Sequence, residues 1–332
     1  MMEEEAAAPL EGKEQSKELL PHGQWSLPLS DGTCMPAVGL GTWKLPKGHE
    51  RLRSVISAAV GAGYRSFDCA ELYNNQKALG HAFQELLSSG VIHSREQLFL
   101  TSKLWNTNHR PALVLEACSR TLKELQVEWL DLYLLHWPVA FLPEARPPYR
   151  RGPFVRAELL DNETSLQDTW RAMEELVAKG MVKGIGVSNF TQNNLKQLLS
   201  FARIPPLVDQ IEMHPYLLQP QLLDYCAANN IKVVAYSPLA QGTKRGGSGG
   251  LLQEPTVGEV AERHNKSGAQ VVLRWAIQHG VAVIPKSERE EHLRQNIALF
   301  DFELNQNDMS LLDSLHCGKR TIKAWLPHHR WD

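Results

Sequence analysis

No apolar run in this 332-residue sequence approaches the ~18 consecutive residues that a membrane-spanning helix requires. The N-terminal stretch MMEEEAAAPLEGKEQSKELL is acidic and lacks the hydrophobic core of a secretion signal. The five cysteines are scattered without a close pair, which is typical of a reducing compartment and not of a disulfide framework. We therefore expect a cytoplasmic protein that has no membrane partner.

The chain also lacks an excess of either charge. Its formal net charge of −2 gives no reason to expect nucleic acid as a partner. No expected strand is followed by a G-x-G-x-x-G turn, which weakens an open doubly wound nucleotide-binding sheet as the fold. We interpret residues 1–24 as a disordered extension and residues 25–332 as a single domain, because α/β barrels exceed ~200 residues as one unit.

Eight short segments are apolar on both faces, as parallel strands covered by helices must be. They are residues 37–42, 65–70, 98–105, 130–137, 184–189, 207–213, 232–239 and 281–286. Helical periodicity fills the gaps between them, for example in the apolar face of Val114, Cys118, Leu122 and Leu125. Thr164 and Gln167 have the spacing of a capping box ahead of a second such face, formed by Leu166, Trp170, Met173 and Val177.

Strands that alternate with helices predict a right-handed, closed (β/α)8 barrel, with the open doubly wound sheet as the alternative architecture. Asp31-Gly32 predicts a hairpin ahead of the first barrel strand. Two long connections, residues 139–163 and 242–250, follow strands and should lie at the C-terminal face, where barrel enzymes keep their chemistry. We expect the Gly-rich loop 242–250, with Lys244 and Arg245, to be a mobile lid that orders over a bound cofactor.

Four polar residues lie at or just beyond the ends of consecutive expected strands: Asp68, Tyr73, Lys103 and His136. Each alone has an ordinary structural interpretation, such as a helix cap, an ion-pair member or a satisfied interior group. Together, on one face of a barrel, they predict a site for chemistry.

The motifs around these residues resemble those of the aldo-keto reductase family, from about Leu27 to the C-terminus. The matching stretches, in order, are GLGTWK (39–44), DCAELYNNQ (68–76), LTSKLWN (100–106), LDLYLLHWP (130–138), GIGVSNF (184–190), VDQIEMHPY (208–216), AYSPLA (235–240) and IPKS (284–287). The resemblance implies a (β/α)8 barrel and a nicotinamide cofactor that lies extended across the C-terminal face. It also implies a catalytic tetrad of Asp68, Tyr73, Lys103 and His136.

The chemistry of such a tetrad follows from the reaction. Hydride addition to a carbonyl carbon places negative charge on the oxygen, which then needs a proton donor and hydrogen bonds. The pKa of a free tyrosine, ~10, is high for this task, and a nearby ammonium such as that of Lys103 lowers it. Asp68 would hold the lysine, and His136 would orient the carbonyl.

The resemblance also assigns cofactor contacts, position by position. Ser188, Asn189 and Gln210 resemble the ligands of the nicotinamide carboxamide, and Tyr236 resembles the ring that stacks on the nicotinamide. Ser237 and Leu239 would cover the pyrophosphate. The adenosine end would be held by Lys286, Ser287, Arg289, His292 and Asn296.

Substrate contacts follow from the same resemblance. Trp43 and Trp137 would wall the pocket beside His136, and the C-terminal stretch from Cys317, including Trp325, would complete its rim. The expected partner is a small carbonyl compound, and a monomer is the family's usual state. The adjacent His328 and His329 lack a third ligand at a suitable spacing, so no metal site is expected.

Two departures from the family pattern bear on the cofactor. Gln76 stands where the family commonly has a glutamate, which we associate with the adenine end. His292 stands where NADP-selective members place an arginine. We expect NADPH/NADP+ as the cofactor, with NADH as a second possibility.

Three functions remain open at this point. The first is an NADP(H)-dependent reductase of aldehydes or ketones, of the alcohol dehydrogenase and carbonyl reductase class. The second is a cofactor-binding regulatory or structural protein on the same scaffold, such as a channel-associated subunit or a lens crystallin. The third is an enzyme that works physiologically as an alcohol or polyol dehydrogenase. The four tetrad residues favour an enzyme, and the sequence does not identify the substrate.

Overall fold

The computed structural model describes residues 18–19, 25–145, 157–241 and 250–322. An antiparallel sheet of three strands opens it: β1 (Glu18–Leu19), β2 (Trp25–Pro28) and β3 (Cys34–Pro36). The predicted hairpin is confirmed, and its turn contains Gly32 at φ +85° and the Asp31 carboxylate, which accepts from the Thr33 amide at 2.9 Å. The strand β1 falls inside the extension that the sequence suggested was disordered, and it pairs with β2.

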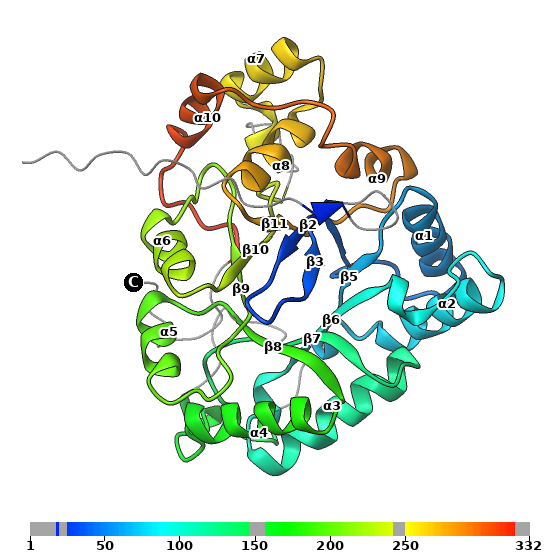
Figure 1. Ribbon diagram of the computed structural model, residues 1–332, viewed down its shortest axis with the longest axis vertical. Coiled ribbons are helices and arrows are strands. Elements are labelled where there is room, and N and C mark those ends of the chain that lie inside the picture. Colours follow the sequence, from blue (N-terminus) through cyan, green and yellow to red (C-terminus); the bar gives the residue numbers. More distant parts are fainter. Residues whose placement is uncertain (1–17, 20–24, 146–156, 242–249, 323–332) are drawn as a thin grey trace, which may run out of the picture.

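Eight parallel strands form the barrel, which is viewed along its axis in Figure 1. A parallel bridge between Val38 and Val283, with the Val283 amide donating to Ala37 O at 2.9 Å, joins its two edges. The (β/α)8 fold is therefore confirmed. In chain order the strands are β4 (Gly39–Gly41), β5 (Ser66–Asp68), β6 (Phe99–Leu104), β7 (Leu130–Leu135), β8 (Val182–Ser188), β9 (Val208–Glu212), β10 (Lys232–Tyr236) and β11 (Ala282–Val283).

Helices surround the barrel on all sides (Figure 1). They are α1 (His49–Gly61), α2 (Gln76–Ser88), α3 (Pro111–Leu125), α4 (Leu166–Ala178), α5 (Gln192–Leu199), α6 (Pro220–Ala228), α7 (Pro255–His264), α8 (Gly268–Gln278), α9 (Glu290–Ile297) and α10 (Gln306–Asp313). The expected apolar face of α3 is buried along its whole length. Among the described residues, none of these helices combines the length and the apolar character needed to cross a membrane.

The boundaries of two elements differ from the sequence prediction for local reasons. The segment 232–239 was expected to be strand throughout, but β10 ends at Tyr236. Ser237 takes a positive φ of +47° and Pro238 has no amide hydrogen, so the ladder cannot continue. The cap of α4 is Ser165, whose hydroxyl accepts from the Asp168 amide at 3.1 Å, and not the predicted Thr164.

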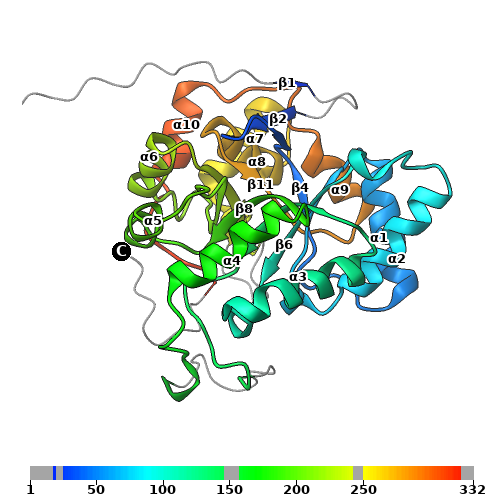
Figure 2. The ribbon, with the colours of Figure 1, turned by 60° about the horizontal axis from the view of Figure 1, so that its bottom comes forward.

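The two ends of the barrel carry different loops. The hairpin lies at the end where the strands begin, and the segment that leads into α4 lies at the opposite end (Figure 2). At the first end a half-buried ion pair joins Arg95 Nη2 to Asp131 Oδ2 at 2.9 Å, and the Leu100 amide donates to the same oxygen at 2.8 Å. The Arg95 guanidinium and the Lys183 ammonium lie over the Trp129 ring, 3.9 and 3.5 Å from its centroid. This cluster fixes the start of β6, β7 and β8.

Much of the two long connections falls outside the described residues. Within the first, Phe141 and Leu160 form an antiparallel bridge that brings the two ends of the connection together. Residues 242–249 of the expected lid, with Lys244 and Arg245, lie outside the described part, so the lid stays a prediction.

Candidate functional site

A lysine, an aspartate and a tyrosine meet at the end of the barrel where the strands finish, here called the mouth. Asp68 ends β5, Lys103 lies near the end of β6, and Tyr73 belongs to the 3-10 helix Glu71–Tyr73 that follows β5. The Lys103 ammonium donates to both oxygens of Asp68, at 2.6 and 2.7 Å, and to Tyr73 Oη at 3.2 Å. Lys103 also donates to Cys69 O at 3.0 Å and is fully buried. Each ammonium hydrogen therefore has a local acceptor, and one of these acceptors is the tyrosine hydroxyl.

His136 completes the predicted group of four. It follows β7 directly, and its amide donates to Leu104 O at 3.2 Å. Its ring stands edge-on to the Tyr73 ring, with the centroids 6.0 Å apart. Burial, and then the Lys103 charge, hold the pKa of His136 well below its usual value, so the imidazole is neutral at physiological pH. His136 Nδ1 is buried and has no hydrogen-bond partner among the described residues.

The electrostatics of Tyr73 differ from the sequence expectation. We expected the Lys103 ammonium to lower the tyrosine pKa. Instead, burial and then the Asp68 carboxylate raise the pKa of Tyr73 well above its usual value. The physical reason is that a phenolate would lose its hydration in this buried site and would lie close to the Asp68 carboxylate. Tyr73 is therefore protonated at neutral pH and holds a proton that it can donate.

A second group of polar side chains joins the first through hydrogen bonds. Gln210 Nε2 donates to Asp68 Oδ1 at 2.8 Å, and the Ser188 hydroxyl donates to Gln210 O at 2.8 Å. Asn189, at a positive φ of +62°, donates to Ser188 Oγ at 3.1 Å and accepts from the Tyr236 hydroxyl at 2.7 Å. The residues predicted for the nicotinamide thus converge on the predicted tetrad.

These side chains fit a nicotinamide. Its carboxamide is planar and offers both donors and an acceptor, which the amides of Asn189 and Gln210 and the hydroxyl of Ser188 can match. Backbone strain is concentrated nearby, because Asn189 and Ser237 both take positive φ values without being glycine. The unpartnered His136 Nδ1 marks unused hydrogen-bonding capacity beside Tyr73.

The residues predicted to cover the pyrophosphate follow β10. Ser237 lies directly after the strand, and Leu239 packs partly buried against the barrel core. Ala240 and Gln241 also have positive φ values, +49° and +63°, so the backbone here turns repeatedly within a few residues. This tight segment places Ser237 and Leu239 just beyond Tyr236, and their contact with a pyrophosphate stays a prediction.

The adenosine residues fit their expected ligand less well. Lys286 Nζ lies 2.7 Å from Glu288 Oε1, and Arg51 from α1 pairs with the other oxygen of Glu288 at 2.9 Å. Arg289 pairs with Glu291 at 3.3 Å, and His292 is exposed on α9. A 2′-phosphate would have to compete with these carboxylates for the two expected cations. Ser287 and Asn296 are buried beside this segment.

The aromatic side chains at the mouth form one group that the sequence predicted only in part. Trp137 is buried in a cluster with Trp105, Phe141 and Ala145. Trp105 was not singled out, although its ring lies edge-on to His136 at 5.2 Å. Its position just after the strand that carries Lys103 was the available signal. Trp43 is 37% exposed, and the Lys44 ammonium lies 4.1 Å from the centroid of its ring.

Gln76 does not support the adenosine end. Its amide is buried between α2, β6 and α3, where it accepts from the Ser102 hydroxyl at 2.6 Å and donates to Glu124 Oε2 at 3.0 Å. The adenosine residues lie on and before α9. The glutamine therefore ties two helices to a strand, and its amide bonds to Ser102 and Glu124 rather than to the residues predicted for the adenosine end.

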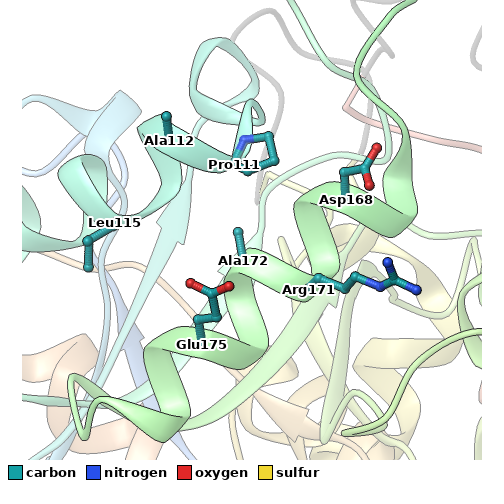
Figure 3. A pocket seen from close by; sticks show the side chains of 7 residues that line it. All are labelled: Pro111, Ala112, Leu115, Asp168, Arg171, Ala172 and Glu175. Carbon is teal, nitrogen blue, oxygen red and sulfur yellow. The ribbon is translucent and has the colours of Figure 1, made fainter.

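A hollow of about 400 Å³ lies on the outer surface between α3 and α4, away from the tetrad. Figure 3 shows Leu115 and Ala112 on α3 and the polar side chains Asp168, Arg171 and Glu175 on the neighbouring α4. The residues that line the hollow are Pro111, Ala112, Leu115, Asp168, Arg171, Ala172 and Glu175. None of the predicted site residues lines this hollow, so we do not associate it with the chemistry.

Comparisons with known proteins agree with the geometry. The model of the aldo/keto reductase family matches residues 37–316. The chain belongs to this family. It is 44% identical over 301 residues to aldo-keto reductase family 1 member A1 of Mus musculus, a match that covers 90% of this chain and 91% of that protein. A related aldo-keto reductase of Danio rerio, member A1-A, is 43% identical over 302 residues, with the same coverage.

A solved structure shares the fold. The aldose reductase of Schistosoma japonicum is 37% identical and superposes with a TM-score of 0.80 over 90% of this chain and 94% of that one.

Proposed function

We propose that this protein is an NADP(H)-dependent oxidoreductase that reduces aldehydes or ketones to alcohols, with Tyr73 as the proton donor. One observation supports this proposal above the others. The buried Lys103 ammonium contacts the Asp68 carboxylate and the Tyr73 hydroxyl at the same time, beside a neutral His136. This is a protonated acid held at the mouth of a barrel, next to a polar group that fits a nicotinamide.

Each member of the tetrad has a separate role in the proposal. A bound, reduced nicotinamide supplies the hydride for the carbonyl carbon. Tyr73 Oη transfers its proton to the carbonyl oxygen as charge develops there. Lys103, whose ammonium contacts Tyr73 Oη, stabilises the phenolate that remains, and Asp68 holds Lys103 in place. The neutral imidazole of His136 donates a hydrogen bond that orients the carbonyl oxygen.

The remaining contacts are part of the same proposal. Ser188, Asn189 and Gln210 bind the carboxamide, Tyr236 stacks on the nicotinamide, and Ser237 and Leu239 cover the pyrophosphate. Lys286, Ser287, Arg289, His292 and Asn296 bind the adenosine phosphate end, and Trp43 and Trp137 contact the substrate. NADPH is the proposed cofactor, and NADH is a second candidate because carboxylates already pair with Lys286 and Arg289. A cytoplasmic location, a monomeric state and a non-membrane setting stay predictions from the sequence.

A direct assay tests this function. Purified protein is mixed with NADPH and an aromatic aldehyde, and oxidation of the cofactor is followed by its absorbance, with NADH in a parallel reaction. We expect turnover that depends on both aldehyde and cofactor and that is lost in Tyr73→Phe. A protein that binds NADPH, yet oxidises it with no aldehyde or ketone of a broad panel, would contradict the proposal and would favour a regulatory or structural role.

A further inference from the structure

Glu212 is a buried carboxylate at the mouth that the proposed reaction does not use. It ends β9, two residues after Gln210, so the two side chains project from the same side of the strand. Gln210 reaches Asp68 at 2.8 Å, which identifies that side as the one that faces the tetrad. In the barrel ladder Glu212 is paired with Tyr236, the proposed nicotinamide-stacking residue. Glu212 therefore lies two residues beyond Gln210 along β9, at the edge of the mouth.

The Glu212 carboxylate is occupied by a distant part of the chain. The Thr321 amide donates to Glu212 Oε1 at 2.7 Å, and the Thr321 hydroxyl donates to the same oxygen. The Ile322 amide lies 3.2 Å from both oxygens. His214 Nε2 lies 3.1 Å from Oε1 on the other side. The contacts of Glu212 with Thr321 and Ile322 join residues that are more than a hundred positions apart in the sequence.

Further bonds hold residues 317–322, here called the C-terminal segment, along the same side of the mouth. The Cys317 and Lys319 amides donate to Tyr216 O, at 3.2 and 3.1 Å. Gln241, which follows β10, donates from Nε2 to Thr321 O at 2.9 Å. The C-terminal segment thus passes over the ends of β9 and β10, and Glu212 is its attachment point on the barrel itself.

We propose that Glu212 is a positioning residue that pins the C-terminal segment over the mouth and so determines which carbonyl compounds fit beside Tyr73. The Glu212 carboxylate is an acceptor with four lone-pair sites, matched to the two amides and the hydroxyl that Thr321 and Ile322 present. It is 1% exposed, so water does not compete for these bonds. The bonds from Thr321 and His214 hold the pKa of Glu212 below its usual value in spite of burial, which agrees with an ionised acceptor.

The structure offers a matched control for this role. Glu174 of α4 is also a buried glutamate whose Oε1 accepts two consecutive amides, those of Arg203 at 2.7 Å and Ile204 at 2.9 Å. It holds the loop that leads into β9, at the end of the barrel opposite the mouth. Glu212→Gln and Glu174→Gln remove the same charge from the same kind of bond, and only the first touches the C-terminal segment.

The first experiment measures amide hydrogen exchange in the full-length protein. In Glu212→Gln we expect exchange at Thr321 and Ile322 to accelerate about tenfold or more, because a charge-assisted acceptor has become a neutral amide with a donor of its own. In Glu174→Gln the acceleration should appear at Arg203 and Ile204 instead. If the Thr321 and Ile322 amides are equally protected from exchange in wild type and in Glu212→Gln, the proposal that Glu212 holds the C-terminal segment in place is overturned.

The second experiment rests on the proposed reductase function and measures KM and kcat for aldehydes of increasing size. For a two-ring aromatic aldehyde, Glu212→Gln should shift KM about fivefold or more, while KM for a three-carbon aldehyde and the dissociation constant of NADPH stay within about twofold. Thr321→Val, which removes only the hydroxyl donor, should give a smaller shift of the same kind. Glu174→Gln should leave the ratio of the two KM values unchanged.

The outcomes separate the two proposals. Equal KM changes for the small and the large aldehyde in Glu212→Gln would overturn the role in substrate choice. If Glu212→Gln does not fold, both measurements are made on Thr321→Val. Unchanged exchange at Ile322 together with an unchanged ratio of the two KM values would then overturn the proposal. If wild type reduces no carbonyl compound, the proposed function fails, and the role in substrate choice fails with it. The exchange experiment still decides whether Glu212 anchors the segment.

Discussion

The barrel carries a pair of opposite charges at each end, and the surroundings of the two pairs differ. At the end where the strands begin, Arg95 donates to Leu98 O at 2.7 Å, Trp129 O at 3.0 Å and Asp131 at 2.9 Å, so its guanidinium ties backbone to backbone. At the mouth, Lys103 shares its ammonium between the Asp68 carboxylate and a tyrosine hydroxyl. A pair bonded to the backbone fixes strands, and a pair bonded to an ionisable side chain can take part in proton transfer.

The surroundings of the two pairs support the same distinction. A neutral histidine with an unpartnered buried nitrogen stands beside the mouth pair. At the other end the Arg95 guanidinium lies over the Trp129 ring, and Asp131 accepts from the Leu100 amide. Polar groups at the C-terminal face of a barrel usually serve function, and those at the opposite face usually serve stability. We therefore expect mutations at the mouth to change turnover and mutations at the other end to change only stability.

The largest effect should come from Tyr73→Phe. Loss of the hydroxyl that we propose as the proton donor should lower turnover by about 10²–10⁴-fold, because that is what a positioned acid contributes. NADPH binding, measured by quenching of tryptophan fluorescence, should survive. A variant that keeps more than about a tenth of wild-type turnover, with chemistry shown to limit the rate, would remove Tyr73 from the role of acid.

The next largest effect is on stability. Lys103→Met leaves the buried Asp68 carboxylate without its cation, which should cost about 3–5 kcal/mol in the free energy of unfolding. Arg95→Met should cost less, about 1.5–3 kcal/mol, because the Lys183 ammonium, 3.6 Å from Asp131 Oδ1, remains.

Arg294→Met is the control, because Arg294 and Glu290 form an exposed pair that should contribute less than about 1 kcal/mol. Urea unfolding curves of the three variants give these values. A loss in Arg95→Met no larger than that of the control would contradict the structural role of the Arg95 pair.

A smaller effect concerns the stability of the fold at low pH. Burial lowers the pKa of His109, which lies beyond the end of β6, to about 4, whereas the unfolded chain titrates near ~6.5. The unfolded state therefore binds a proton first, and stability that is complete above pH ~6.5 is lost progressively as the pH falls towards about 4. At pH 5 this loss is about 2 kcal/mol for the one group.

His109→Gln should remove that part of the loss. The free energy of unfolding is measured at pH 7.5 and pH 5, and the drop between them should be smaller in the variant by about 2 kcal/mol. Using the drop cancels any cost of the substitution that does not depend on pH. An identical drop in wild type and variant would mean that His109 is not buried in its neutral form.

The smallest expected effect concerns the adenosine end. His292→Arg should strengthen NADPH binding by about tenfold and leave NADH nearly unchanged, because arginine offers a charged fork to the 2′-phosphate. Fluorescence titrations with both cofactors measure the change. If His292→Arg has no effect and Arg289→Ala abolishes the preference for NADPH, the phosphate is bound by Arg289, and the role of His292 is wrong.

The sequence predicts most of the fold because its signals are local. Seven of the eight apolar segments each contain a barrel strand, the eighth overlaps β8, which begins two residues earlier at Val182, and Asp31-Gly32 marks the hairpin. The ends of strands were harder to predict from the sequence. The strand β10 ends because Ser237 takes a positive φ, and no local sequence signal indicates that backbone angle. The capping residue of α4 was missed by one position for a similar reason, because Thr164 and Ser165 are both able to cap.

The site was predictable where neighbouring strands bring residues together. Asp68 and Lys103 end adjacent parallel strands, so their contact follows from the fold. Three features required the structure. The raised pKa of Tyr73 depends on how deeply the side chain is buried and on how close the Asp68 carboxylate lies. The position of Trp105 beside His136 depends on the conformation of the loop that follows β6. The contact between Glu212 and Thr321 joins segments that are far apart in the sequence.

The central claim is that only the charge pair at the mouth takes part in the reaction. Turnover of NADPH with an aromatic aldehyde, measured for Lys103→Met and Arg95→Met at equal concentrations of folded protein, tests it most directly. We predict a loss of about a hundredfold or more in Lys103→Met and a change of less than about threefold in Arg95→Met. Equal losses in the two variants would contradict the account.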